Sequence, residues 1–381
     1  MKKFSFIPIS EPVLNPNAKK YLMDCIKTNW ISSQGKYINI LEKKLSAYHK
    51  VRHCILTSSC TAALHISLKA LGIKNGDEVI CPDLTFIAPA NMIVLSGAKL
   101  KLVDIDPETL TICPSKIKKN ITKRTKAIIV VHQFGHAAKM DEIMQIAKKY
   151  NLKVIEDNAE SIGGKYKGKI LGSIGHVSTL SFYANKIITT GEGGAVLTNS
   201  KVVADKARLL RDHAFSQTKD IIKRYNHNYL GYNYRMTNLQ AAVGVSQLES
   251  INKILKRRKF IENKYNKKLN FLKEIEMRSY KKWCTPVSWL IALRLKTKNK
   301  KMRNRLIYFL QSKGVDARPM VKPVHEARHF KKMFNKKNYL NSISQSMFSF
   351  HLPSSPNLSN DKINYICNQL RLFLKKNEKK I

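Results

Sequence analysis

The chain has 381 residues, of which 43% are hydrophobic and 25% charged, and its 69 Lys and Arg against 26 Asp and Glu give a net charge of +43. This much apolar material can bury a large core, which excludes disorder over the whole length. No apolar run reaches the roughly 18 residues of a membrane-spanning helix, and the first residues lack a secretion signal, so we expect a cytoplasmic protein of two domains.

The first half of the chain predicts helices followed by an alternating strand and helix pattern. Residues 16–50 predict two short helices around a turn. Apolar strands separated by helices then follow, which is typical of a parallel sheet with helices on both faces. Ligands bind such sheets beyond the carboxyl ends of the strands, so we expect the informative residues there. The expected strands are residues 53–59, 77–84, 99–105, 126–135 and 152–159.

After Met236 the pattern changes to a long helical run, and we place the domain boundary inside it. Residues 1–245 are then a large α/β domain and residues 246–381 a smaller α+β domain. Within the smaller domain we expect a helix over 303–314, with Gly314 as its C-cap, and a final helix from about Asp361. Strands are expected at 289–296 and 315–319.

The positive charge is concentrated in the smaller domain, where residues 246–381 hold 33 Lys and Arg against 8 Asp and Glu. Such an excess is typical of proteins that bind nucleic acid or anionic membranes. The lysine clusters lack the interleaved aromatic residues of a base-stacking surface, so we favour solvated faces over a nucleic-acid site. A positive field would still help to gather a substrate that carries a pyrophosphate.

Lys186 and Asp157 are the residues best placed for chemistry. Lys186 lies between an apolar stretch and a Gly/Thr turn, where a partly desolvated lysine can form a Schiff base; a solvated turn lysine is the alternative. Asp157 ends an apolar strand, and a protonated pyridine nitrogen would supply the cation it needs; a helix N-cap or a salt bridge is the alternative. The stretch SSCT at 58–61 opens a helix and is typical either of a phosphate site or of an ordinary N-cap.

Several other site types are disfavoured. The seven cysteines form no CxxC pair and no Cys/His cluster, and GxxxxGK[ST], GxGxxG after a strand, GxSxG and HExxH do not occur. His132 and His136 have helical spacing, but Gly135 between them favours a turn. We therefore expect no disulfide scaffold, no P-loop or dinucleotide fold, and no metal.

The motifs TSSCTAALHISLKALGI, VIEDNAESIGG, SFYANKIITTGEGGAVLTN and GYNYRMTNLQAA, in this order, resemble the sugar aminotransferases, enzymes of fold type I that use pyridoxal phosphate (PLP). The resemblance covers nearly the whole chain. It implies that Lys186 forms the Schiff base and moves the proton, and that Asp157 keeps the pyridine nitrogen protonated. It places Phe86 on the ring, Glu160 near the ring hydroxyl, and Cys60, Thr61 and Ser181 at the phosphate. It also implies a homodimer in which Asn233 reaches the active site of the other subunit.

Within this family the motifs are most similar to the perosamine synthases, which act on GDP-4-keto-6-deoxymannose with L-glutamate as amino donor and serve polysaccharide synthesis. A related dehydratase branch has histidine in place of Lys186, so the lysine favours amino transfer. A UDP- or dTDP-linked 4-keto-6-deoxyglucose, or a 3-keto sugar, stays an alternative substrate. Ser33, Arg318 and His325 are candidates for substrate contacts. An amino-acid aminotransferase, or a regulatory or nucleic-acid-binding protein on the same fold, is a more distant alternative.

Overall fold

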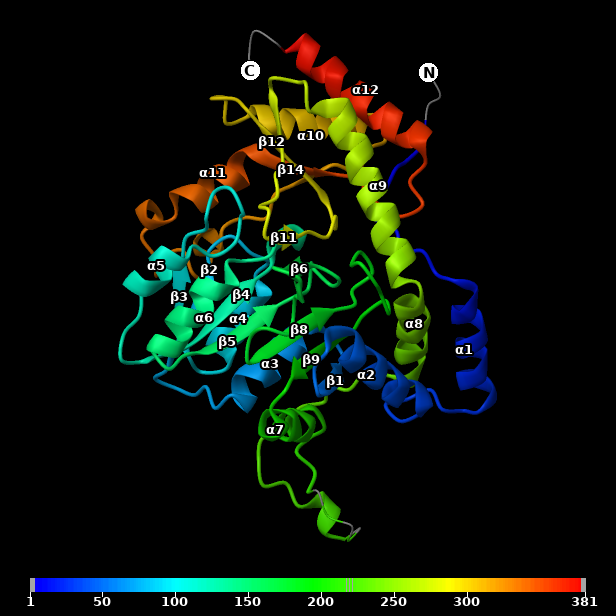
Figure 1. Cartoon of the computed structure of the whole chain (residues 1–381), viewed down its shortest axis with the longest axis vertical. Helices are drawn as coiled ribbons and strands as arrows, with labels where there is room; N and C mark the ends of the chain where they lie inside the picture. The colour runs from blue at the N-terminus through cyan, green and yellow to red at the C-terminus, as the bar shows by residue number, and fades with distance from the viewer. Residues whose placement is uncertain (1–3, 217, 219, 221, 378–381) are drawn as a thin grey trace.

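Residues 4–377, apart from 217, 219 and 221, are described by a computed structural model. The chain builds two main sheets with separate hydrophobic cores, and the long helix α9 (Ile251–Leu269) runs from the larger part to the smaller one (Figure 1). No helix in the described ranges is long and apolar enough to cross a membrane.

Two helices precede the large sheet, as the sequence predicts. α1 (Pro16–Lys27) begins with a proline, whose missing N–H is not needed in the first turn. α2 (Lys36–His49) ends at Lys50, which has a left-handed φ of 56°. Both helices pack on α8 (Asn238–Glu249), where a Cβ on Gly244 would lie 2.5 Å from the Leu41 side chain. This close approach packs α2 tightly against α8.

The large sheet has seven strands in the order β1-β9-β8-β5-β4-β2-β3. The strands from β8 to β3 are parallel, as expected, whereas β9 runs antiparallel to both of its neighbours. The reversal arises because β8 and β9 are joined by a loop, which contains Lys186, and not by a crossover helix. The strands are β1 (His53–Thr57), β2 (Glu78–Pro82), β3 (Lys99–Val103), β4 (Thr125–Val131), β5 (Lys153–Asp157), β8 (Val177–Ser181) and β9 (Gly194–Thr198).

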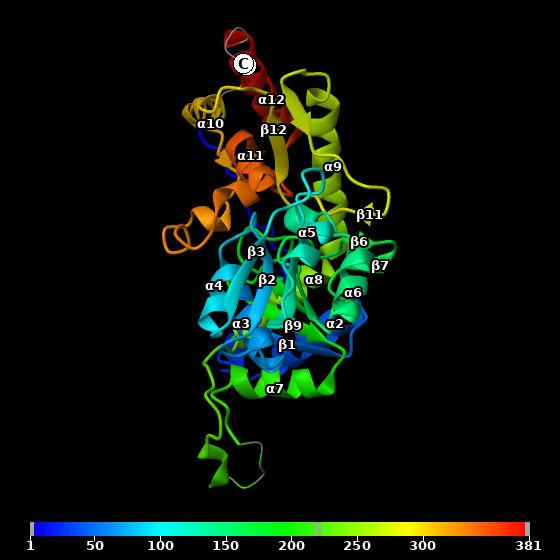
Figure 2. The same cartoon turned by 90° about the vertical axis from the view of Figure 1, so that its left-hand side faces the viewer.

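Helices cover both faces of this sheet because its strands are apolar on both sides. In β4, Ile129 packs in a core with α3 and α4, while its neighbours Ile128 and Val130 pack in a core with α6 on the opposite face. The segment between α7 and α8 extends away from both cores in Figure 1 and Figure 2. The remaining helices of this part are α3 (Cys60–Ala70), α4 (Ala88–Leu95), α5 (Pro114–Lys119), α6 (Met140–Lys149) and α7 (Lys201–Arg211), with short 3₁₀ turns η1 (Gln133–Gly135) and η2 (Lys223–Tyr225).

The smaller part is built on an antiparallel sheet in the order β10-β12-β14-β13. Its core includes Ile7 from the start of the chain, which bridges to Val315. The proposed boundary at 245/246 falls inside α8 and stays a prediction. The elements are β10 (Ile275–Met277), β12 (Ile291–Leu295), β13 (Arg318–Pro319), β14 (Ser349–Leu352), α10 (Met302–Ser312), α11 (Leu340–Phe348) and α12 (Asn360–Lys376), with 3₁₀ turns η3 (Val324–Glu326) and η4 (Lys336–Asn338); a third sheet joins β11 (Cys284–Thr285), β6 (Lys165–Tyr166) and β7 (Lys169–Ile170).

We expect Leu306→Ala to lower the free energy of unfolding by about 2–5 kcal/mol, because this side chain on α10 is fully buried in the smaller core and its truncation leaves a cavity. Tyr308→Ala is the matched control on the same helix, since its side chain is 69% exposed and should change stability by only about 0.5 kcal/mol. Chemical denaturation measures both values. Equal effects of the two substitutions would contradict this description of the core.

Candidate active site

The carboxyl ends of β5 and β8 and the loop after β8 bring the predicted charged residues together. Asp157 is the last residue of β5 and Ser181 the last of β8. Lys186 lies in the β8–β9 loop, and its side chain is only 13% exposed. The alternative of a solvated turn lysine is therefore wrong. The site lies where the ligand crevice of a parallel sheet is expected.

Two groups face the Lys186 ammonium. Its Nζ lies 3.9 Å from Glu160 Oε1 and 3.9 Å from the centre of the Trp289 ring. The other carboxylate oxygen of Glu160 accepts the Phe134 N–H at 2.7 Å. Burial raises the pKa of Glu160, although Lys186 and the Phe134 N–H oppose this shift. The lysine is thus held between a desolvated carboxylate and an aromatic face.

Asp157 is buried, and no basic side chain in the described part of the chain lies within salt-bridge distance of it. Its Oδ1 accepts the Ala159 N–H at 3.0 Å. Burial raises the pKa of this carboxyl, and the Ala159 N–H, Lys186 and His132 oppose the shift. A carboxylate in this position requires a cationic partner that side chains do not supply. A bound pyridinium ring fits that requirement.

The start of α3 forms the second half of the site. Ser59 caps the helix by accepting the Ala62 N–H at 3.1 Å, and the N–H groups of Cys60 and Thr61 have no partner within the helix. Gly194, which pairs with Ser181 across the sheet, allows the close approach, because a Cβ there would lie 2.5 Å from the Cys60 nitrogen. The structure therefore brings Cys60 and Ser181 together, and an anion at this helix N-terminus would lie between them.

Cys60 itself is held as a neutral thiol. Burial raises its pKa well above the ordinary value, with Asp157 adding to the shift and Thr179 and Lys186 opposing it.

The remaining predicted residues lie outside this cluster. Phe86, between β2 and α4, has a ring that is 61% exposed and available for stacking. Ser33 is half-buried on the turn between α1 and α2, and Asn233 is exposed on the segment between α7 and α8, where it forms a β-bridge with Asp212. No contact between either residue and Lys186 is found in the described residues.

Arg318 and His325 are both engaged by acidic side chains. The Arg318 Nε and Nη2 donate to the two carboxylate oxygens of Asp316 at 3.0 and 2.9 Å. His325 contacts the Asp83 carboxylate through its Nδ1 at 2.8 Å and through its backbone N–H at 2.9 Å. Its Nε2 is buried and has no partner in the part of the chain that the structure describes.

His132 and His136 have structural partners, as the turn between them predicts. The Nδ1 of His132 accepts the Ala138 N–H at 3.2 Å, so its Nε2 carries the proton and donates to Glu156 at 2.9 Å. The Nε2 of His136 accepts the Lys281 N–H at 3.3 Å. This pair fixes the loop after β4 that carries Phe134.

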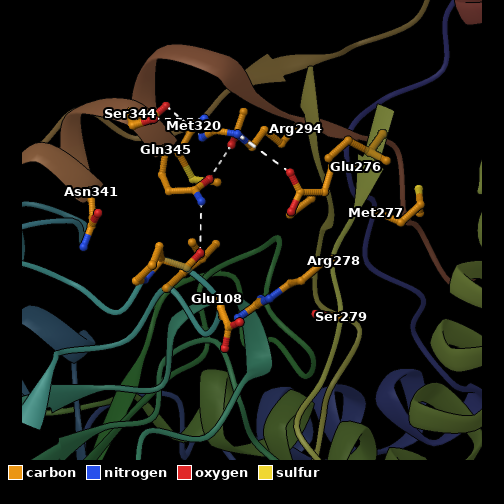
Figure 3. A pocket seen from close by; sticks show the side chains of 15 residues that line it. Glu108, Glu276, Met277, Arg278, Ser279, Arg294, Met320, Asn341, Ser344 and Gln345 are labelled. Atoms are coloured by element: carbon orange, nitrogen blue, oxygen red, sulfur yellow. Dashed lines mark hydrogen bonds and ion pairs between the residues drawn. The ribbon is translucent and has the colours of Figure 1, made fainter. Parts of the chain in front are cut away.

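A separate cavity of about 360 Å³ lies between the two main parts of the chain (Figure 3). Its arginines already have partners: Arg294 donates to the Ser344 hydroxyl at 2.9 Å, and Arg278 donates to the carbonyls of Gln133 and Phe134 at 2.8 and 2.7 Å. None of the predicted site residues lines this cavity. The cavity is therefore separate from the cluster around Lys186.

The sequence pattern of the DegT/DnrJ/EryC1/StrS aminotransferase family matches residues 12–371. The chain belongs to this family. It is 39% identical to the GDP-perosamine synthase of Escherichia coli O157:H7, over 97% of this chain and 98% of that protein. It is 38% identical to the GDP-perosamine synthase of Vibrio cholerae, over 96% of this chain and 99% of that protein.

The fold and the cofactor agree with this membership. A Streptococcus pneumoniae protein solved in its PLP form is 26% identical, with a TM-score of 0.91 over 97% of this chain and 99% of that one. The chain is a PLP-dependent aminotransferase of fold type I. The residues present fit the cofactor, because the buried Asp157 lacks a cationic partner in the described part of the chain and the first N–H groups of α3 have no partner within the helix, which suits a phosphate.

Sequence reasoning missed Trp289 and Arg258, which hold Lys186 from the smaller part of the chain. Arg258 is 2% exposed, and its Nη2 donates to the Lys186 carbonyl at 3.4 Å. Arg258 lies on α9 and Trp289 lies just before β12, and both are far from the β8–β9 loop in the sequence. No local pattern would have identified them.

We expect Asp157→Asn to stabilise the cofactor-free protein at pH 7. Because the pKa of this carboxyl is raised in the folded protein, its protonated form stabilises the fold, and this contribution is complete only below the ordinary pKa of about 3.9. The contribution is lost as the pH rises through the pKa that the carboxyl has in the folded protein. The advantage of the amide should therefore shrink as the pH falls toward about 4. Denaturant unfolding at several pH values measures it.

Asp141→Asn is the control, because the exposed Asp141 pairs with Lys167 and its pKa is lowered. Removing that charge should not stabilise the protein at pH 7. A gain equal to that of Asp157→Asn, or a gain at Asp157 that does not depend on pH, would show that burial of the Asp157 charge is not the cause.

Proposed function

We propose that this aminotransferase transfers the amino group of L-glutamate to a nucleotide-linked 4-keto-6-deoxy sugar, and that GDP-4-keto-6-deoxymannose is the preferred substrate, giving GDP-perosamine. The observation that carries the proposal is the 38–39% identity to two GDP-perosamine synthases over nearly the full length of each chain. UDP- and dTDP-linked 4-keto-6-deoxyglucose and 3-keto sugars are the alternative substrates.

Lys186 and Asp157 are the proposed catalytic residues. PLP, when bound, carries the amino group between donor and acceptor and withdraws electrons from the carbon that loses a proton. The Lys186 amine would bind the cofactor and then move the proton at that carbon. Its largely buried position in the β8–β9 loop is suitable for both tasks. Asp157 would hold the proton on the ring nitrogen, because its buried carboxylate has no competing cation.

The remaining cofactor contacts are proposed on the same geometry. The N–H groups and side chains of Cys60 and Thr61 would bind the phosphate at the start of α3, together with Ser181. The exposed ring of Phe86 would stack on the pyridine. Glu160 would bind near the ring hydroxyl through Oε1, since its Oε2 already accepts the Phe134 N–H.

Recognition of the sugar nucleotide is proposed for Ser33, Arg318 and His325. The unpartnered Nε2 of His325 is free to bond a substrate hydroxyl, and Asp83 fixes the orientation of its ring. Arg318 would have to share its guanidinium with Asp316 to reach a phosphate. The net charge of +43 would attract the pyrophosphate over a longer range. The cytoplasm stays the expected location, and polysaccharide synthesis the expected pathway.

A homodimer with shared active sites is proposed because Asn233 is exposed and has no hydrogen bond or ion pair with Lys186 in the described part of its own chain. Figure 2 shows that the segment between α7 and α8 extends away from the rest of the chain, and Leu230 and Tyr229 on this segment are 78% and 63% exposed. Such an apolar extension favours contact with a second copy. Asn233 would then bind the cofactor phosphate of the other subunit.

The function is tested by incubating the PLP-loaded protein with L-glutamate and, separately, GDP-, UDP- and dTDP-linked 4-keto-6-deoxy sugars. We expect mass spectrometry to show an amine in place of the carbonyl oxygen of the GDP sugar, with an equal amount of 2-oxoglutarate. Lys186→Ala should abolish repeated turnover, whereas Lys201→Ala, an exposed lysine on α7, should not. Repeated turnover by Lys186→Ala, or reaction of the UDP or dTDP sugar alone, would overturn the mechanism or the nucleotide assignment respectively.

The shared site is tested by subunit complementation. Lys186→Ala and Asn233→Ala should each be nearly inactive as homodimers. A mixed dimer of the two should regain up to about half of the wild-type activity, because one of its two sites combines an intact Lys186 with an intact Asn233. Mixing after denaturation and refolding, followed by the assay above, measures the recovery. If mixing restores nothing, Asn233 does not act across the interface.

A further inference from the structure

The Lys186 ammonium rests on an aromatic face to which the reaction above assigns no role. Its Nζ lies 3.9 Å from the centre of the Trp289 ring, well within the range of a cation–π contact. Trp289 is 6% exposed, so water competes little for the ammonium. Among the aromatic side chains, the indole of tryptophan binds cations most strongly.

Trp289 is held rigidly from three directions. Its indole N–H donates to the carbonyl of Asn185, the residue before Lys186, at 2.8 Å. Its ring lies nearly parallel to that of Phe134, with an interplanar angle of 9° and centres 6.0 Å apart. Its carbonyl accepts hydrogen bonds from Arg258 Nη1 and from the Ser354 hydroxyl, both at 2.7 Å. The ring is therefore a fixed surface, and the lysine is the group that moves.

Arg258 ties the indole and the lysine to one another. The same guanidinium that binds the Trp289 carbonyl donates through Nη2 to the Lys186 carbonyl at 3.4 Å and to the Ser10 hydroxyl at 3.2 Å. Because the backbones of both residues share one buried donor, the distance between the ring and the base of the lysine side chain is fixed.

We propose that Trp289 is a positioning residue: its ring binds the ε-ammonium of Lys186 whenever the lysine is not joined to the cofactor. The inference rests on the proposed role of Lys186 as the cofactor lysine. To join PLP, the ammonium would first give up one proton; the amine nitrogen would then bond the aldehyde carbon, the aldehyde oxygen would leave as water, and the proton would return to the nitrogen, so that the net charge is unchanged. The ammonium must leave the indole for this step.

The proposal predicts a difference between two forms of the cofactor. Binding of PLP breaks the ammonium–indole contact, whereas pyridoxamine phosphate, which has an amine in place of the aldehyde, leaves the contact in place. Loss of the indole should therefore favour PLP relative to pyridoxamine phosphate. A cation–π contact of ordinary strength corresponds to a change of roughly 3- to 30-fold in the ratio of the two dissociation constants.

The experiment measures the dissociation constants of PLP and pyridoxamine phosphate for the full-length protein by equilibrium dialysis, without amino donor or sugar. In Trp289→Leu we expect the ratio of the PLP constant to the pyridoxamine phosphate constant to fall by roughly 3- to 30-fold. Trp289→Phe keeps a weaker aromatic face and should show a smaller fall. Trp283→Leu is the matched control, because Trp283 packs on Tyr166 and His136, and it should leave the ratio unchanged.

Use of a ratio removes effects that weaken both ligands equally, such as a general loosening of the fold. If Trp289→Leu does not fold, as judged by circular dichroism, the sign of the change in Trp289→Phe decides. An unchanged or increased ratio overturns the proposal, even if the sugar assay succeeds. Failure of the wild-type protein to bind PLP would overturn the cofactor role of Lys186 and this inference together. Failure of every sugar to react would leave the ratio as an independent result.

Discussion

Burial of charge at the carboxyl edge of the large sheet is the constraint on which the site depends. Asp157, Glu160 and Lys186 lie together with little access to water, so one ammonium must compensate two carboxylates whose pKa values burial raises. In the described part of the chain, no basic side chain other than Lys186 forms an ion pair with either carboxylate. This arrangement leaves Asp157 with backbone contacts alone, which keeps its carboxylate available for a cationic ligand.

The reversed strand β9 follows from the same requirement. The β8–β9 loop turns back at the carboxyl end of β8 and so keeps Lys186 at the edge of the sheet. A crossover helix in its place would carry the lysine away from this edge. The turn also brings Gly194 against the first turn of α3, because only a residue without a side chain fits there. One loop therefore positions both the lysine and the phosphate-binding helix.

The smaller part of the chain contributes to the site two side chains that bind the backbone of the loop containing Lys186. Arg258 on α9 and Trp289 before β12 bind the loop that contains Lys186, so the two parts cannot move independently at this point. Arg258 is buried and donates to carbonyls and hydroxyls through Nη1 and Nη2, whereas its Nε has no partner among the described residues. Such a guanidinium is costly to desolvate, and the hydrogen bonds of Nη1 and Nη2 offset part of that cost.

The sequence by itself predicted five of the seven strands of the large sheet, and it indicated Lys186 and Asp157 as the candidates for the chemistry. Those features depend on local signals: apolar runs of strand length, and polar residues such as Asp157 at the ends of strands. Only the tertiary structure decided that β9 runs antiparallel, that Asp83 binds His325, and that Trp289 faces Lys186. No local sequence signal indicates that these residues meet, so the contacts are established only when the two cores pack.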